Sequence, residues 1–303
     1  MNLSAFHGII AYPVTPFHQH DGSVDVTMLN RLIDRLVAEG SHGIAPLGST
    51  GESAYLGDEE WDRVAEASIK RVAKRLPVIV GISDLTTRNA VRRAKFAEAA
   101  GADAVMVLPV SYWKLGEAEI FRHYAAIADA IRLPIMVYNN PATSGIDMQP
   151  DLIVKLAREI DNVAMIKEST GDIQRMHRIA QLSDGRVPFF NGSNTLALEA
   201  FAAGAAGWCT AAPNLAPAWP ARLYDACRQG DLERARTVFY RLLPYLQFLM
   251  KHGLPTAVKA GLALRDLPVG LPRLPLAPLA DPAALRQLRD LLDALDLDPE
   301  AAA

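Results

Sequence analysis

The chain has 303 residues, of which 50% are hydrophobic and 21% are charged, and its formal net charge is -3. These values are typical of a globular protein and exclude a disordered or fibrous chain. Charges of both signs are spread along the sequence, so neither a basic surface for nucleic acid nor a nucleic-acid partner is expected.

Strand-like and helix-like segments alternate eight times. Short apolar runs without polar alternation predict buried parallel strands at residues 8–15, 43–47, 77–81, 104–108, 134–138, 163–166, 188–190 and 207–211. Apolar residues at helical spacing predict helices between them at residues 26–39, 59–75, 87–100, 117–131, 150–160, 172–182 and 195–203. Eight such units in roughly 225 residues favour an α/β fold of the (β/α)8 type, the TIM barrel, over an open doubly wound sheet.

The remaining sequence has a helical pattern. We expect helices at about 231–250, 256–264 and 282–295, with a proline-rich stretch at 267–282 that packs along the surface as an extended strap. The sequence therefore predicts two regions. Residues 1–223 form the catalytic barrel, and residues 224–303 form a C-terminal helical appendage packed on it.

Several classes of protein are unlike this sequence. Cys209 and Cys227 are the only cysteines, which is too few for a disulfide framework or a zinc site. No Gly-x-Gly-x-x-Gly fingerprint follows a strand, which argues against a dinucleotide fold, and we expect no cofactor and no metal. The sequence has neither an N-terminal targeting pattern nor an apolar run of membrane-spanning length. We therefore expect a cytoplasmic protein with no membrane partner.

One lysine stands at the carboxyl end of a predicted core strand. The run Val163-Ala164-Met165-Ile166 leads directly into Lys167. A lysine is costly to bury as a cation, so this position favours a lowered pKa and a nucleophilic amine. The alternative is a structural lysine that extends to the surface or pairs with Glu168.

Other polar residues are expected at the same end of the barrel, where barrel enzymes place their active sites. They are Ser49 and Thr50, which follow the second strand, Tyr138 at the end of the fifth, and Cys209 in the eighth. Lys167 can attack the ketone of a 2-oxo acid to form an imine, and a phenol can move the protons that this requires. Backbone N–H groups of the turn at residues 48–51 can hold the substrate carboxylate. The set lacks the carboxylate and histidine cluster of a metal-dependent enolising enzyme.

Four motifs together resemble a known family. They are Gly48-Ser49-Thr50-Gly51-Glu52, Tyr138-Asn139-Asn140-Pro141, Ile166-Lys167-Glu168 with Thr170-Gly171-Asp172, and Asn191-Gly192-Ser193. In this order, on these strands, they are similar to the dihydrodipicolinate synthase / N-acetylneuraminate lyase superfamily of class I aldolases. The resemblance covers nearly the whole chain.

The resemblance implies roles for individual residues. It implies Lys167 as the Schiff-base lysine, Tyr138 as the proton-relay tyrosine, Ser49 as the relay hydroxyl, and Tyr112 as a tyrosine lent to a neighbouring subunit's site. It implies substrate contacts by Gly48, Thr50, Gly192 and Cys209. Because the family is commonly a tetramer of tight dimers, a homo-oligomer built as a dimer of dimers is also expected.

One departure bears on the substrate. Synthases of the family carry an arginine a few residues after the relay tyrosine, but residues 141–145 here are Pro-Ala-Thr-Ser-Gly. A site without that cation should bind aspartate semialdehyde poorly. We therefore predict a Schiff-base lyase or deaminase for a small 2-oxo acid or cyclic imino acid. Examples are 1-pyrroline-4-hydroxy-2-carboxylate deaminase and the keto-deoxy sugar-acid dehydratases and aldolases.

Three alternatives stay open. The first is 4-hydroxy-tetrahydrodipicolinate (dihydrodipicolinate) synthase, which condenses pyruvate with aspartate semialdehyde. The second is a barrel without catalysis that binds a metabolite. The third is a metal-dependent aldolase, whose activity would vanish with a chelator.

Overall fold

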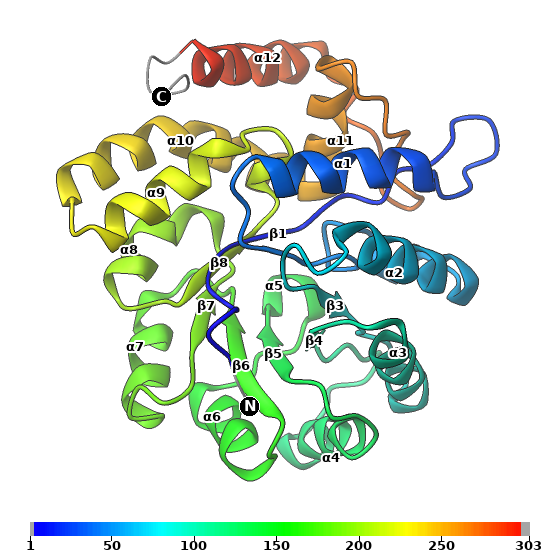
Figure 1. Ribbon diagram of the computed structural model, residues 1–303, viewed down its shortest axis with the longest axis vertical. Helices are drawn as coiled ribbons and strands as arrows, with labels where there is room; N and C mark the ends of the chain where they lie inside the picture. Colours follow the sequence, from blue (N-terminus) through cyan, green and yellow to red (C-terminus); the bar gives the residue numbers. More distant parts are fainter. Residues whose placement is uncertain (1–2, 298–303) are drawn as a thin grey trace.

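The computed structural model describes residues 3–297, which form the expected (β/α)8 barrel (Figure 1). Its parallel strands follow the order β2-β1-β8-β7-β6-β5-β4-β3 in one sheet. A parallel bridge between Ile44 and Val78 joins the two ends of that order and closes the barrel. The strands are Gly8–Ala11 (β1), Gly43–Ile44 (β2), Ile79–Gly81 (β3), Ala104–Val107 (β4), Ile135–Asn139 (β5), Val163–Glu168 (β6), Phe189–Asn191 (β7) and Gly207–Thr210 (β8).

Helices surround the strands, as Figure 1 shows. Those that follow β1 to β8 are Val26–Ala38 (α1), Asp58–Val72 (α2), Thr87–Ala100 (α3), Glu117–Ala128 (α4), Pro141–Ser144 (α5), Pro150–Glu159 (α6), Ile173–Leu182 (α7), Ala197–Ala202 (α8) and Ala218–Arg228 (α9). Short 3-10 turns lie at Ser53–Tyr55, Asn194–Leu196 and Ala212–Asn214. The short helix α5 and the helix α9 were not predicted from the sequence.

Several strands are shorter than predicted, and the first two differ most. The first ends at Ala11 instead of residue 15, because Pro13 has no N–H to continue the ladder. The second ends at Ile44 instead of residue 47, because Pro46 follows and Leu47 has a left-handed φ of 61°. In both places the chain leaves the sheet early and forms a loop at the carboxyl end of the barrel.

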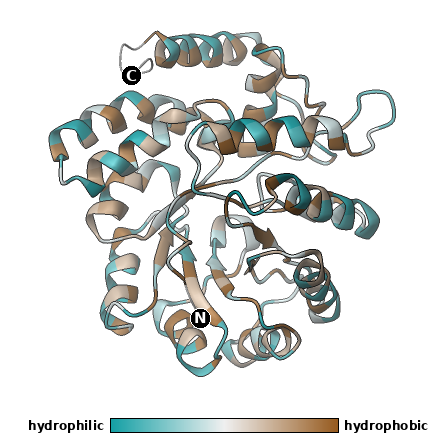
Figure 2. Cartoon of the chain, in the orientation of Figure 1, coloured by the Kyte–Doolittle hydropathy of each residue, from teal (hydrophilic) through white to brown (hydrophobic). Residues whose placement is uncertain are grey.

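Side chains alternate between the barrel interior and the helix layer. Ile10, Met106, Met136, Met165 and Phe190 belong to one buried cluster in the interior. Most of the residues beside them along the strands join a second cluster under helices α1 to α7, whereas Ile9 joins the cluster under the C-terminal helices. Figure 2 shows that outer helices such as α1 and α2 carry hydrophilic residues together with hydrophobic ones, as expected for helices with one face on the core.

The C-terminal helices share a core with the barrel. They are Leu232–His252 (α10), Leu254–Leu264 (α11) and Pro282–Asp296 (α12). Trp208 of β8, Leu246 of α10 and Leu288 of α12 are fully buried in one cluster. The predicted boundary between residues 223 and 224 lies inside α9. Figure 1 shows α12 at the edge of the molecule farthest from α4 and α6.

Within residues 3–297, no helix is both long enough and apolar enough to span a lipid bilayer.

Candidate active site

Neighbouring strands bring Lys167 and Tyr138 together. The two residues are direct partners in the parallel register of β5 and β6, and Phe190 of β7 is the partner of Lys167 on its other side. Both side chains follow an inward-pointing methionine by two residues, so the strand alternation turns them into the barrel interior. They therefore meet at the carboxyl end of the sheet, as the sequence predicted.

The Lys167 amine is buried between two aromatic rings. The side chain is 4% exposed, and its Nζ lies 3.7 Å from the ring centroid of Tyr138 and 4.2 Å from that of Tyr12. It makes no ion pair with a carboxylate among residues 3–297. Glu168 faces the other side of the strand, where its carboxylate accepts hydrogen bonds from the Asn139 amide and the Thr170 N–H. Lys167 is therefore not a surface lysine paired with Glu168.

The Tyr138 hydroxyl is the centre of a polar network. It accepts a hydrogen bond of 2.9 Å from the Asn140 amide and is hydrogen-bonded to Ser49 and Lys167. Burial alone would raise the pKa of Tyr138. The positive charge of Lys167 and the three hydrogen bonds outweigh burial, and they lower that pKa below its ordinary value. A phenol with a lowered pKa beside an amine is suited to moving protons at pH values where tyrosine is otherwise inert.

The turn after β2 is held in an unusual backbone conformation. Leu47 and Glu52, at its two ends, have left-handed φ angles of 61° and 57°. The Thr15 hydroxyl donates a hydrogen bond of 2.6 Å to the Gly51 carbonyl. Such backbone strain persists only where surrounding contacts hold it, and it is common at functional sites. The turn places the Ser49 side chain beside the Tyr138 hydroxyl and buries Thr50, which is 2% exposed.

Gly192 lies against the Lys167 side chain. A Cβ at position 192 would lie 2.7 Å from Lys167 Cε and closer still to Ser169 Oγ. The backbone of this glycine therefore forms part of the wall around the lysine. Cys209 is buried nearby, and burial raises the pKa of its thiol against the opposing charge of Lys167. At this position a neutral thiol acts as a small apolar wall residue.

We expect Gly192→Ala to lower kcat by about 10²-fold, because the added methyl group must displace the Lys167 amine from its position. Gly116→Ala is the matched control, since a Cβ at that residue meets nothing closer than 3.6 Å. Steady-state kinetics of both variants check this. Equal rates for Gly192→Ala and the wild type would contradict it.

An open cavity of about 620 Å³ adjoins Tyr138 and the turn after β2, and Lys167 is not among the residues that line it. Its lining includes Gly48, Ser49 and Tyr138, together with Thr143 of α5 and Arg93 of α3. Tyr112 is not brought into this site. It lies in the loop after β4 with its side chain 92% exposed, next to Trp113, which is 80% exposed.

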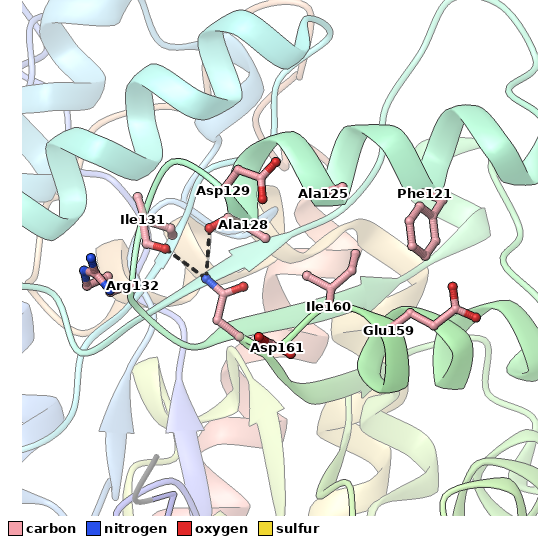
Figure 3. A pocket seen from close by; sticks show the side chains of 10 residues that line it. Phe121, Ala125, Ala128, Asp129, Ile131, Arg132, Glu159, Ile160 and Asp161 are labelled. Carbon is pink, nitrogen blue, oxygen red and sulfur yellow. Dashed lines mark hydrogen bonds between the residues drawn. The ribbon is translucent and has the colours of Figure 1, made fainter.

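A second groove, of about 470 Å³, lies at the opposite end of the barrel (Figure 3). Asp129 and Arg132 precede β5, and Asp161 and Asn162 precede β6, so the groove is at the amino ends of the strands. The Asn162 amide donates to the carbonyls of Ala128 and Ile131, which spans the loop under α4. None of the predicted site residues lines this groove. Among the described residues, no group of three or more His, Cys, Asp or Glu side chains is arranged to hold a metal ion.

The sequence analysis gave no role to four residues that the structure places around the site. They are Tyr12 beneath Lys167, Asn140 on Tyr138, and the buried ion pair Glu52–Lys259 behind the turn. The alternation of the first strand was a usable signal for Tyr12, because it stands two residues after the inward-pointing Ile10. No local pattern links Glu52 to Lys259, which is far away in the sequence.

Comparison with known proteins decides the family. The sequence model of the dihydrodipicolinate synthetase family matches residues 5–295. The chain belongs to this family. One relative, the 4-hydroxy-tetrahydrodipicolinate synthase of Syntrophobacter fumaroxidans, is 37% identical over 272 residues, which cover 89% of this chain and 92% of the relative.

Solved structures agree with the family assignment. A putative dihydrodipicolinate synthetase from Pseudomonas aeruginosa is 60% identical with a TM-score of 0.93, covering 96% of this chain and 99% of that one. The 4-hydroxy-tetrahydrodipicolinate synthase of Methylacidiphilum fumariolicum SolV is 31% identical with a TM-score of 0.92, covering 96% of each chain. The chain is thus a lyase of the dihydrodipicolinate synthetase family, within the class I aldolases.

Proposed function

We propose that this lyase forms a Schiff base between Lys167 and a small 2-oxo acid. The observation that carries the proposal is the buried Lys167 amine, which faces two phenol rings and has no carboxylate partner in the described residues. The adjacent Tyr138 hydroxyl, with its lowered pKa, supplies the proton transfers. In the turn at residues 48–52, the Ser49 and Thr50 N–H groups are the ones that can hold the substrate carboxylate, because the Gly51 and Glu52 N–H groups already donate to the carbonyls of Gly48 and Ser49.

The steps of imine formation follow from this arrangement. The neutral Lys167 amine adds to the ketone carbon, and the carbonyl oxygen takes a proton from Tyr138. The new ammonium nitrogen returns one proton to the Tyr138 phenolate, which gives a neutral carbinolamine. Tyr138 then protonates the carbinolamine hydroxyl, which leaves as water, and the nitrogen becomes a protonated imine. The Ser49 hydroxyl lies beside Tyr138, and the Asn140 amide donates to the phenol oxygen and holds it in place. The protonated imine then withdraws electrons, so the neighbouring carbon can lose a proton or a substituent.

The names of the relatives favour condensation as the overall reaction. Several 4-hydroxy-tetrahydrodipicolinate synthases are 36–37% identical to this chain. In that reaction the imine of pyruvate loses a methyl proton, and the resulting enamine attacks the aldehyde of aspartate semialdehyde. The new carbon–carbon bond and a later attack by the substrate's amine release Lys167 unchanged.

The residues that line the cavity favour a second candidate for the overall reaction. Residues 141–145 contain no arginine, and α5 contributes Thr143 to the wall instead. Arg93 is the one cation among the described lining residues, and it already pairs with Asp84 at 3.4 Å and Asp58 at 3.5 Å. A second substrate carboxylate thus has no free cation to bind. This supports dehydration or deamination of a hydroxylated 2-oxo acid or cyclic imine, in which Lys167 would open the ring by transimination.

A substrate comparison separates the candidates. The purified protein is incubated with pyruvate plus aspartate semialdehyde, with 1-pyrroline-4-hydroxy-2-carboxylate, and with 2-keto-3-deoxy sugar acids, and products are followed by NMR. Condensation predicts kcat/KM of at least about 10⁴ M⁻¹s⁻¹ for the first mixture and little turnover of the others. The second candidate predicts the reverse. Binding without turnover or covalent adduct across the panel would overturn the proposal in favour of a metabolite-binding barrel.

Tyr138→Phe is expected to lower kcat by about 10²–10⁴-fold with any accepted substrate, because the variant keeps the ring but loses the proton-carrying hydroxyl. The matched control is Tyr240→Phe on the exposed face of α10, where the tyrosine is 63% exposed. Stopped-flow or steady-state rates measure the effect. A loss smaller than about threefold would show that another group moves the protons.

We further propose that Tyr112 acts in a neighbouring copy of the chain, in a dimer of dimers in the cytoplasm. Its 92% exposure beside the exposed Trp113 supports this, since two aromatic rings in contact with water are typical of a surface that another protein covers. Sedimentation of the wild type and of Tyr112→Ala, combined with mixing of Tyr112→Ala and Lys167→Ala subunits, tests it. Activity recovered on mixing is expected, and its absence would contradict the proposal.

A further inference from the structure

Tyr12 is fixed beneath the active-site lysine. It follows β1 directly, where its N–H donates to the Thr210 carbonyl, and its side chain is 3% exposed. The ring lies on Gly48, because a Cβ at position 48 would approach Tyr12 Cδ1 to 2.6 Å. At its far end the hydroxyl donates to Met106 Sδ at 2.9 Å. Both ends of the ring are therefore held, and its face cannot turn away from Lys167.

The two phenols around Lys167 have different environments. Burial, together with the nearby Cys209 and Tyr138, raises the pKa of the Tyr12 hydroxyl well above its usual range. That hydroxyl is directed at Met106 and Cys209 and not at the amine. Tyr12 therefore stays neutral and presents only the face of its ring to the lysine. The Tyr138 ring also lies against the amine, at 3.7 Å, but Tyr138 adds a hydroxyl with a lowered pKa that can exchange protons. Environments that separate two like groups in this way commonly mark different roles.

We propose that Tyr12 stabilises the positive charge that the Lys167 nitrogen carries as a protonated imine. The 4.2 Å between Lys167 Nζ and the Tyr12 ring centroid is within the range of a cation–π interaction, and a buried site strengthens it. The inference rests on the proposed function, because the charge matters for catalysis only if the imine forms.

The chemistry explains why such a group is needed. The amine must be neutral to attack, but after water leaves, the nitrogen must hold a proton in order to withdraw electrons from the neighbouring carbon. Ordinarily a carboxylate would stabilise that charge, and among the described residues none pairs with Lys167. An aromatic face stabilises the cation without offering a base that would remove the proton. No further reactant is involved, and the lysine is released by hydrolysis.

The test compares the wild type with Tyr12→Phe and Tyr12→Leu. Each protein is incubated with pyruvate and sodium cyanoborohydride, which reduces the protonated imine, at pH values from about 6 to 9.5, and adduct formation is followed by intact mass. Tyr12→Leu is expected to move the alkaline midpoint of trapping downward by about one pH unit. Tyr12→Phe retains the ring face, and we expect it to keep the wild-type midpoint. An unshifted midpoint in Tyr12→Leu, or an equal shift in Tyr12→Phe, would overturn the role of the ring.

A second substitution guards against misfolding of the leucine variant. Pentafluorophenylalanine at position 12 keeps the shape of the ring but withdraws electron density from its face, so it should shift the midpoint in the same direction as Tyr12→Leu. Circular dichroism and thermal unfolding verify the fold of each protein. The wild-type protein separates the two proposals. If it forms no adduct with pyruvate or any substrate of the panel, imine formation itself is refuted. If it forms an adduct whose alkaline midpoint does not change on substitution of position 12, only the inference about Tyr12 is refuted.

Discussion

Replacing Lys167 with alanine is expected to lower kcat by on the order of 10⁶-fold, which is the scale of loss when an enzyme loses its covalent nucleophile. The fold should survive, because Lys167 forms no ion pair in the described part of the chain and its neighbours are mainly rings and backbone. Binding of the substrate carboxylate by the turn at residues 48–52 should persist. We therefore expect the effect on kcat to be far larger than the effect on KM.

Two further variants define the cause of that loss. Lys167→Arg keeps a positive charge between the rings of Tyr12 and Tyr138 but has no nucleophilic amine, so it should be as inactive as Lys167→Ala. Lys155→Ala on the exposed face of α6 is the matched control and should retain full activity. Steady-state rates measure all three. Residual activity of Lys167→Arg above a few per cent would contradict covalent catalysis by this lysine.

The ion pair between Glu52 and Lys259 is expected to have the largest single effect on stability. Lys259 Nζ of α11 lies 2.7 Å from Glu52 Oε1, and both side chains are at most 2% exposed. The other carboxylate oxygen accepts the Arg273 N–H at 2.6 Å, and Lys259 also donates to the Leu271 carbonyl at 3.0 Å. Because Glu52 ends the strained turn that carries Ser49 and Thr50, the C-terminal region supports the active site through this pair.

Lys259→Met is expected to lower the free energy of unfolding by about 3–5 kcal/mol, because it leaves the Glu52 carboxylate buried without its cation. Glu52→Gln should have a similar cost, and the double variant should lose much less than the sum of the two single losses. Lys251→Met, at an exposed position near the end of α10, is the control. Urea unfolding measures each value, and strictly additive losses would contradict a coupled pair.

The same pair gives a pH dependence with a definite sign. Burial, opposed by the charge and hydrogen bond of Glu52, lowers the pKa of Lys259 to about 8, whereas an unfolded lysine titrates near about 10.4. Between these values the unfolded chain binds the extra proton, so the free energy of unfolding rises with pH. Relative to Lys259→Met, the wild type should therefore gain stability as pH rises from about 8 to 10, and it should lose this gain as pH falls through 8. A constant difference across this range would contradict it.

Much of the fold and part of the site could be predicted because their signals are local. The alternation of apolar runs and helical periods predicted eight units, and the strand ends predicted that Lys167 and Tyr138 are neighbours, which the register of β5 and β6 confirms. The strand lengths were less predictable, since Pro13 and Leu47 end their strands through backbone constraints that a hydrophobic pattern does not show.

The remaining features depend on contacts between distant parts of the chain. Tyr12 faces Lys167 only because the barrel closes and places β1 near β6 across the interior. Nothing in the local sequence distinguishes Glu52 from an ordinary turn residue, because its partner Lys259 belongs to α11, which packs against it only in the folded chain. Likewise, the boundary drawn after residue 223 divides α9, because a helix that joins the barrel to its appendage has no local signal of which region it belongs to.

Intact-protein mass after incubation with pyruvate and sodium borohydride tests the central claim most directly. The wild type is predicted to gain one reduced pyruvate-sized adduct, mapped by peptide analysis to the segment that contains Lys167, and Lys167→Ala is predicted to gain none. An adduct on another lysine, or no adduct in the wild type with pyruvate or with any substrate of the panel, would contradict Schiff-base catalysis by Lys167.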